Sequence, residues 1–258
     1  MLKKSLSQHL LKDRNILKKM LSKTDIDDKD TVIEIGAGKG DLTRLLAASA
    51  KKVYAVEIDT QFSPYLDRIA EELKNVEIIY EDFLEIDLKP LKNDMLKVIG
   101  NIPYKITGPI LFKLFKDRGY LKSAFLTVQK EVAQRIVAEP KTSSFGSLSV
   151  ISQVLAHCRV EFYIPPHVFF PAPKVESAFV SMRFKKESQK IPEGFFQFVR
   201  NCFRHKRKLL WNSLRSAYDS SIVESLFEKA RLERSVRAEE LPPEKFLELF
   251  YIFNGMHE

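Results

Sequence analysis

Short apolar segments alternate with amphipathic stretches through the first half of this chain, and that alternation limits the folds available to it. Short continuous apolar runs indicate buried strands, and apolar residues at helical spacing indicate helices. The expected strands are residues 31–35, 52–56, 76–80 and 124–128, with one more beginning at Val98. Strands that alternate with helices in this way form a mainly parallel sheet with helices on both faces, which is an α/β fold.

The pattern changes beyond this region. A helix and two strands are expected next, at residues 147–157, 159–164 and 175–184. The proline-stiffened loop between these two strands predicts an antiparallel hairpin at one edge of the sheet. The polar stretch at residues 185–190 then indicates a boundary, because only helical periodicity follows it. We therefore expect a larger α/β domain over residues 1–187 and a small all-helical domain over residues 188–258.

Composition is that of an ordinary globular protein. Hydrophobic residues make up 45% of the 258 residues and charged residues 29%, and no apolar run is long enough to span a membrane. Lysines and an aspartate interrupt the N-terminal region where a signal peptide needs an apolar core, so we expect a cytoplasmic protein. The two cysteines and five histidines are scattered, which indicates neither a disulfide framework nor a metal site. The net charge of +8 suggests a polyanionic partner.

A glycine turn, EIGAGKG, follows the first expected strand. Gly36, Gly38 and Gly40 allow a ligand to approach the backbone closely. The turn is not a phosphate-binding P-loop, because the terminal Gly-Lys-Ser/Thr is missing. Nor does it fit a dinucleotide, since only Lys39 separates the last two glycines where that fingerprint has two residues. The spacing favours a nucleoside cofactor without a pyrophosphate.

Acidic residues follow the next two strands. Glu57 ends the second strand, where a carboxylate can accept from both hydroxyls of a ribose. Asp82 follows the third strand, where it can accept from an adenine amino group, with Phe83 beside the ring. Each acid alone could be a solvated loop carboxylate. Their placement at successive strand ends, where such sheets bind ligands, predicts an adenosine-containing cofactor.

The fourth strand stops at the sequence NIPY. Asn101 can both donate and accept hydrogen bonds, Pro103 fixes the backbone, and Tyr104 offers a flat ring for stacking. These properties suit the binding of a planar ring that carries an amine. Asn and Pro are also common in ordinary strand-to-helix turns, so this stretch alone does not decide between the two.

Basic residues dominate one stretch of the C-terminal region. No acidic residue lies between Glu193 and Asp219. The same interval contains Arg200, Arg204, Lys206, Arg207, Lys208 and Arg215. A solvated helix face usually mixes charges of both signs, so this stretch predicts contacts with nucleic-acid phosphates.

Nine motifs together resemble one family, the KsgA-type ribosomal RNA adenine dimethyltransferases of the small subunit. They are SQHLL at residues 7–11, EIGAGKG at 34–40, the acid Glu57, EDF at 81–83, NIPY at 101–104, QKEVAQR at 129–135, FGSLSV at 145–150, VFFPAPKVES at 168–177 and FRHKRKLLWNSL at 203–214. The resemblance covers nearly the whole chain. One departure is Ser7, where the family usually has glycine.

The resemblance implies a class I, Rossmann-like methyltransferase. It would transfer methyl groups from S-adenosylmethionine to the exocyclic amines of two adjacent adenosines near the 3′ end of 16S-type RNA, with a role in small-subunit maturation. The cofactor-binding residues would be Gln8, His9, Leu11, Gly36, Gly38, Glu57, Ile58, Asp82, Phe83 and Asn101. The residues around the target base would be Asn101, Ile102, Pro103, Tyr104 and Phe169, and the RNA-binding residues Arg200, Arg204, Lys206, Arg207 and Lys208.

The position of Phe169 leaves a choice open. It is expected to close the face of the base opposite Tyr104, but it could instead be a core aromatic residue, with Phe170 as the competing ring. The expected partner is the small ribosomal subunit, and the enzyme is expected to act as a monomer without a metal or a membrane.

Three other functions remain as alternatives. The first is a large-subunit RNA methyltransferase of the macrolide-resistance type, which FRHKRKLLWNSL argues against. The second is an RNA-binding assembly factor or transcription-factor relative that keeps the fold without turnover. The third, a nicotinamide-dependent oxidoreductase, is disfavoured by the glycine spacing and by the lack of a hydride-handling His or Lys.

Overall fold

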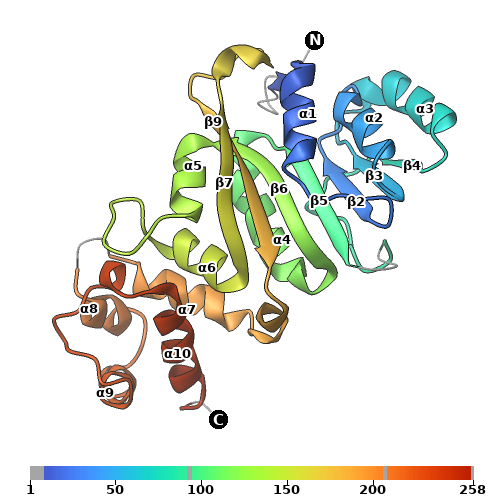
Figure 1. The fold of residues 1–258 in the computed structure, drawn as a ribbon. Coiled ribbons are helices and arrows are strands. Elements are labelled where there is room, and N and C mark those ends of the chain that lie inside the picture. Colours follow the sequence, from blue (N-terminus) through green and yellow to red (C-terminus); the bar gives the residue numbers. More distant parts are fainter. Residues whose placement is uncertain (1–8, 92–94, 206–207, 257–258) are drawn as a thin grey trace. The chain divides into compact units, whose positions relative to one another are not determined.

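A seven-stranded sheet forms the centre of the computed structural model, which describes residues 9–91, 95–205 and 208–256 (Figure 1). In spatial order its strands are β4 (Val76–Ile79), β3 (Lys52–Val56), β2 (Thr31–Ile35), β5 (Leu96–Asn101), β6 (Leu121–Gln129), β9 (Ser177–Phe184) and β7 (Ala156–Ile164). The strands from β4 to β6 are parallel, and β9 runs antiparallel to β6. The chain order reverses between β2 and β5, which is where doubly wound sheets bind ligands.

Helices cover both faces of this sheet. They are α1 (Arg14–Ser22), α2 (Asp41–Ala47), α3 (Ser63–Glu72), α4 (Thr107–Lys116) and α5 (Lys130–Ile136). Apolar residues of α1, α2 and α3 pack in one cluster with alternate residues of the strands, such as Val53 and Ala55. The buried residues of α4 lie outside that cluster, and Figure 1 shows α4 behind the sheet. The mainly parallel α/β architecture predicted from the sequence is therefore confirmed.

Two glycines allow close packing in the first unit, one within the sheet and one at the start of α2. A Cβ atom on Gly100 would lie 2.7 Å from the carbonyl oxygen of Ile35, so only glycine fits where β5 passes β2. Gly40 has φ of +80°, and a Cβ atom there would collide with Ile69 of α3. These positions need glycine for steric reasons, whether or not a ligand is bound.

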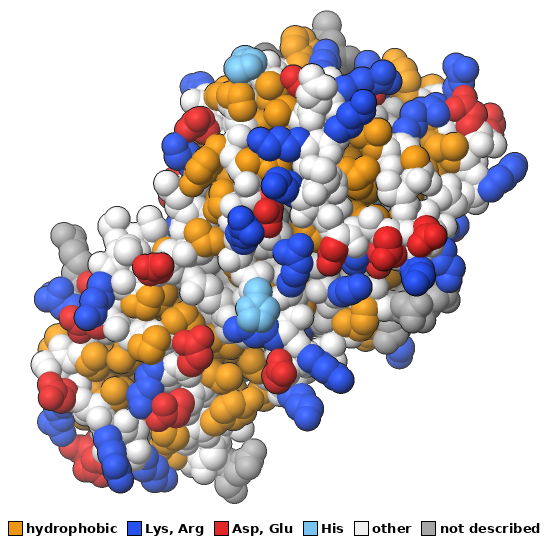
Figure 2. Space-filling view, viewed as in Figure 1, with side chains coloured by type: hydrophobic (Ala, Val, Ile, Leu, Met, Phe, Trp, Pro, Cys, Tyr) orange, Lys and Arg blue, Asp and Glu red, His pale blue; other side chains and the backbone are white. Residues whose placement is uncertain are grey.

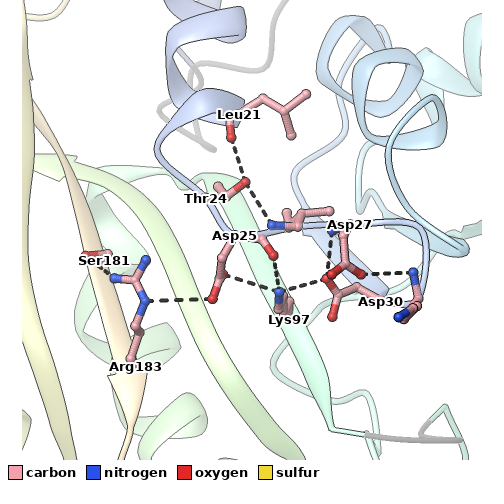
Figure 3. Close-up of polar contacts among 10 residues, drawn as sticks. Leu21, Thr24, Asp25, Asp27, Asp30, Lys97, Ser181 and Arg183 are labelled. Carbon is pink, nitrogen blue, oxygen red and sulfur yellow. Dashed lines mark hydrogen bonds and ion pairs between the residues drawn. The ribbon is translucent and has the colours of Figure 1, made fainter.

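A buried lysine marks the beginning of β5. Lys97 is 1% exposed, and its ammonium lies 2.7 Å from Asp30 Oδ2, 2.5 Å from the Asp25 carbonyl oxygen and 3.3 Å from Asp25 Oδ1 (Figure 3). Arg183 on β9 lies 3.8 Å from the other oxygen of Asp25. This cluster joins the loop after α1 to two strands of the sheet.

The chain divides into two compact units, which we describe separately. The first is residues 1–133 and 159–184, and the second is residues 134–158 and 185–258. The second unit contains α6 (Ser147–Leu155), α7 (Gly194–Cys202), α8 (Leu210–Arg215), α9 (Ser220–Lys229) and α10 (Pro243–Asn254). The sequence-based boundary near residue 187 lies close to one of these divisions, but residues 134–158 group with the C-terminal helices.

Aromatic rings make up much of the interior of the second unit. Phe195 and Phe198 of α7 lie 5.6 and 5.7 Å from the ring of Phe250 in α10. Phe145, which precedes α6, lies 6.0 Å from Phe203. Segment 134–158 therefore contributes to the same core as α7 and α10. No motif in the sequence predicts this long-range contact. No helix among the described residues is long and apolar enough to cross a membrane.

Candidate active site

A pocket of about 220 Å³ opens where β2, β3 and β5 end, next to the reversal of strand order. Most of the residues predicted from the sequence line it: His9, Gly36, Glu57, Ile58, Asp82, Phe83, Asn101, Ile102, Pro103 and Tyr104. The sequence-based interpretation missed Leu10, Lys105, Ile106 and Ile110, which also line it. Of these, Ile110 could have been found, because it lies at helical spacing with the other buried apolar residues of α4, the helix that follows NIPY.

Glu57 is held rigidly at the wall of this pocket. It is 3% exposed, and its two carboxylate oxygens accept from the backbone N–H groups of Gly38 and Asp59, each at 2.8 Å. Burial raises the pKa of this carboxyl group. Each oxygen keeps a further lone pair, so both can still accept from a ligand hydroxyl. Gly38 does not line the pocket, and its N–H orients Glu57 instead.

Flat apolar surfaces stand beside a second acid. Ile58 is 50% exposed at the pocket, which is unusual for an isoleucine, and the buried Phe83 also lines it. Asp82 Oδ1 accepts from the backbone N–H of Leu84 at 2.9 Å, which fixes the carboxylate and leaves Oδ2 for a ligand. Apolar faces with one fixed acceptor suit a planar heterocycle that carries an amine.

A smaller pocket of about 150 Å³ shares Leu10, Gly36 and Asn101 with the first. Charged residues of both signs line it, namely Lys12, Lys39 and Asp41, together with Leu11 and the buried carboxyl group of Glu34. Such a lining suits a zwitterion, because it can pair with an ammonium and a carboxylate together.

Glu34, in the wall of the smaller pocket, is 2% exposed. It accepts from the Thr43 hydroxyl at 2.5 Å. Burial raises its pKa to about 8, so the carboxyl group is mostly protonated at neutral pH.

Asn101 lies between the two pockets at the end of β5. Its side-chain Nδ2 donates to the carbonyl oxygen of His9 at 2.7 Å. This bond fixes the orientation of the carboxamide and leaves its oxygen as the group that a ligand can meet. A hydrogen-bond donor on a ligand would therefore find a preoriented acceptor.

His9 and Tyr104 connect this strand end to the loop that carries the phenylalanines. The rings of His9 and Tyr104 lie 5.3 Å apart, and His9 Nδ1 donates to the Pro171 carbonyl oxygen at 2.6 Å. The Tyr104 hydroxyl bonds Ser177 Oγ at 2.5 Å, and burial raises the pKa of the tyrosine. These bonds hold the Tyr104 ring in place over the pocket.

The two phenylalanines differ in exposure. β1 (Leu10–Leu11) pairs with β8 (Phe169–Phe170), so the two rings point to opposite sides. Phe169 is 4% exposed, packs in the main core cluster and does not line the pocket. Phe170 is 58% exposed, with the Lys12 ammonium 4.2 Å from its ring centre. Neither ring lines the pocket, but Phe170, the alternative ring, exposes a face that a ligand could contact.

Part of the predicted RNA-binding stretch is described in the second unit. Arg200 near the end of α7, and Arg204 and Lys208 in the segment after it, are exposed. Lys206 and Arg207 lie outside the described residues, as does Gln8 from the predicted cofactor site. Among the described residues no group of three potential ligands could hold a metal ion.

Comparison with known proteins decides the family. A family model described as ribosomal RNA adenine dimethylase matches residues 1–255. The chain belongs to this family. Its curated relatives include the ribosomal RNA small subunit methyltransferase A of Levilactobacillus brevis, 38% identical over 98% of this chain and 90% of that protein. The corresponding protein of Ligilactobacillus salivarius is 40% identical over 96% of this chain and 88% of that one.

Solved structures of similar enzymes agree with this membership. A dimethyladenosine transferase from Plasmodium falciparum matches with a TM-score of 0.84 and 28% identity, over 96% of this chain and 98% of that one. The 23S rRNA methyltransferase ErmE matches with a TM-score of 0.71 and 25% identity, over 95% of this chain and 99% of that one.

The ribosomal RNA adenine dimethylase family accounts for the predictions made from the motifs. The family resemblance, the Rossmann-like fold, the enzyme class and the use of S-adenosylmethionine are confirmed. The roles of individual site residues stay predictions.

Proposed function

We propose that this enzyme transfers methyl groups from S-adenosylmethionine to the exocyclic amines of two adjacent adenosines near the 3′ end of small-subunit ribosomal RNA. The product would be dimethyladenosine at both positions. The observation that carries the chemistry is the fixed carboxamide of Asn101 between two pockets. The choice of the small subunit is supported by curated relatives named small subunit methyltransferase A, at 38 and 40% identity.

The two pockets suit the two halves of the cofactor. The adenosine half fits the larger pocket, with the ribose on Glu57 and the adenine against Ile58 and Asp82. The methionine half fits the smaller pocket, whose charged residues match its ammonium and carboxylate. Because both pockets include Asn101, the sulfonium between the two halves would lie next to this residue. The methyl group would then lie at the end of β5.

The residues at this strand end suit attack by an aromatic amine. Such an amine is a poor nucleophile, because its lone pair is delocalised into the ring. If Asn101 Oδ1 and the Ile102 carbonyl oxygen accept its two hydrogens, the nitrogen can pyramidalise and direct its lone pair at the methyl carbon. S-adenosylmethionine would supply the methyl group by breaking its C–S bond as the C–N bond forms, and the resulting ammonium would be acidic enough to lose a proton to water. Orientation of the reactants can contribute on the order of 7 to 11 kcal/mol.

Stacking would keep the target adenine out of its helix. The Tyr104 ring, fixed by Ser177, is one platform, and Phe170 or Phe169 would supply the other. Stacking of a base on an aromatic side chain is worth roughly 1 to 3 kcal/mol, which offsets much of the few kcal/mol needed to unstack it.

The basic segment after α7 would supply affinity for the phosphates of the RNA. Its exposed described members are Arg204 and Lys208, and Arg200 precedes it. We further propose that the enzyme acts as a monomer in the cytoplasm, without a metal, during maturation of the small subunit.

One experiment tests the substrate. The enzyme is incubated with methyl-labelled S-adenosylmethionine and, in separate reactions, with unmethylated small subunits, unmethylated large subunits and naked RNA. We expect label on two adjacent adenosines of small-subunit RNA. Label in large-subunit RNA alone would overturn the proposal and favour the macrolide-resistance type, to which the similarity to ErmE also points. No label in any RNA would favour a non-catalytic assembly factor.

A further inference from the structure

A second exposed ring lies in the same compact unit as the pocket. Tyr163 on β7 is 47% exposed, and the Lys130 ammonium lies 5.2 Å from its ring centre. Glu176 Oε2 lies 2.6 Å from the same ammonium. The backbone N–H of Lys130 also donates to the Glu176 carbonyl oxygen at 2.9 Å. Lys130 is therefore held by both its backbone and its side chain, and its charge stays beside the tyrosine ring.

The trio of Tyr163, Lys130 and Glu176 is connected to the residues over the pocket. Glu176 directly precedes Ser177, whose hydroxyl bonds Tyr104 at 2.5 Å. Ser177 is paired in the sheet with Gln129, the residue before Lys130. Two short connections through β9 and β6 thus link Tyr163 to Tyr104. The exposed ring on β7 is thereby connected to the predicted base-binding ring in the turn after β5.

The chemistry of the trio fits one class of ligand. An exposed aromatic ring beside a fixed ammonium offers a stacking surface and a phosphate contact within one nucleotide's reach, which is how proteins bind single-stranded nucleic acid. A purely structural role explains little of this arrangement, because an ion pair between half-exposed side chains such as Lys130 and Glu176 adds little stability. Figure 2 shows hydrophobic and basic side chains intermixed over β7 and β9.

From these contacts we propose that Tyr163, with Lys130 and Glu176, binds a nucleotide that flanks the target adenosine in an unpaired segment of the RNA. The base stacks on the Tyr163 ring, and the Lys130 ammonium contacts its phosphate. Glu176 keeps the ammonium in position. This inference rests on the proposed function, in which a flipped adenine lies on Tyr104. It adds a second base-binding position that would help to select an unpaired sequence.

Affinity for RNA tests this second base-binding position, called the Tyr163 platform below, without depending on methyl transfer. Binding of a labelled single-stranded adenosine-containing oligonucleotide is measured for the wild type, Tyr163→Ala and Tyr163→Phe. One stacked base corresponds to roughly 5- to 150-fold in affinity. We expect Tyr163→Ala to weaken binding within this range, and Tyr163→Phe, which keeps the ring, to bind like the wild type. Lys130→Met should lower the salt dependence of binding by a slope of about 0.7.

A matched control exists on another face of the same unit. Tyr65 of α3 is 49% exposed and has the Lys39 ammonium 5.0 Å from its ring centre. Because no such connection joins Tyr65 to Tyr104 among the described contacts, Tyr65→Ala should leave oligonucleotide affinity unchanged. Equal losses in Tyr65→Ala and Tyr163→Ala would overturn the proposal, since they would indicate a general effect of surface aromatic residues.

Methylation of small subunits, measured in parallel, separates this inference from the proposed function. If the wild type methylates small subunits and Tyr163→Ala matches it in both KM and oligonucleotide affinity, the platform alone is overturned. If Tyr163→Ala weakens binding to subunits but not to the oligonucleotide, the ring contacts protein and the platform is again overturned. If the wild type methylates no subunit while Tyr163→Ala still weakens oligonucleotide binding, the proposed function fails and the platform stands.

Discussion

The two ends of β5 belong to one strand of only six residues, and they use polar side chains in opposite ways. At the amino end the Lys97 ammonium is fully enclosed and meets oxygens of Asp25 and Asp30 (Figure 3). At the carboxyl end the Asn101 side-chain N–H donates to the His9 carbonyl oxygen, and the side-chain oxygen is left for a ligand in the open pocket. A buried polar group whose partners are all internal stabilises structure, whereas one that keeps a fixed and unused acceptor is ready for a ligand.

The largest expected effect tests the amino end. Asp30→Ala removes the buried acid 2.7 Å from the Lys97 ammonium and leaves this buried charge with the exposed Asp25 as its remaining ion-pair partner. Loss of one partner of a buried ion pair costs about 3 to 5 kcal/mol, and urea unfolding should show a loss of this size. Asp28→Ala, an exposed change in the same loop, is the control and should lie near the wild type. If Asp30→Ala unfolds like the control, the amino end does not carry the structural role.

The carboxyl end should show the reverse behaviour. Asn101→Ala removes the preoriented acceptor, and loss of one such hydrogen-bonding group typically costs about 10²- to 10³-fold in rate. Single-turnover methylation should fall by this factor, while RNA affinity and unfolding in urea stay near those of the wild type. Asn101→Asp keeps an acceptor oxygen but loses the N–H that bonds His9, so its rate should lie between the two. Near-normal turnover of Asn101→Ala would refute the role of this residue.

Glu34 tests whether a polar group between the two ends belongs to structure or to the ligand site. It lies on β2 opposite Ile99 of β5, and burial raises its pKa to about 8. Folding therefore takes up a proton between about pH 4.5 and 8, so this group makes stability fall as pH rises through that window and level off above it. The slope is at most about 1.4 kcal/mol per pH unit.

Replacing Glu34 should remove that slope. The free energy of unfolding of Glu34→Gln, measured by urea titration from pH 5 to 9, should depend less on pH than that of the wild type and should exceed it near pH 8. Glu71→Gln, an exposed change on α3, is the control. An unchanged slope in Glu34→Gln would mean that the carboxyl group is already ionised in the folded protein.

The same contrast explains which features the sequence could predict. The ligand site at the carboxyl end of β5 can be predicted from the sequence, because the residues that form it are neighbours in the chain. An amide, a proline and an aromatic ring follow one apolar run. The ion pair of Lys97 cannot be predicted in this way. Its partner Asp30 lies 67 residues away, and no motif near either residue indicates the contact. The choice between Phe169 and Phe170 likewise depends on which ring β1 turns inward, and that register is set by pairing across the fold. Segment 134–158 joins the second unit through contacts of the same long-range kind.

The smallest effect on the methylation rate is expected from the basic segment of the second unit. Changes there should lower RNA affinity and leave the rate unchanged, which is the reverse of Asn101→Ala. Arg204→Ala with Lys208→Ala removes two exposed positive charges, so RNA affinity should fall and the salt dependence of binding should flatten by a slope of roughly 1 to 2. Cofactor affinity and the single-turnover rate at saturating RNA should not change. The double variant Lys190→Ala with Lys229→Ala removes equal charge from exposed positions of the same unit and controls for net charge. If both double variants flatten the salt dependence of binding equally, RNA affinity depends on total charge, and the basic segment after α7 has no special role. If only the first does, affinity comes from this segment and rate from Asn101, and the two can be removed independently.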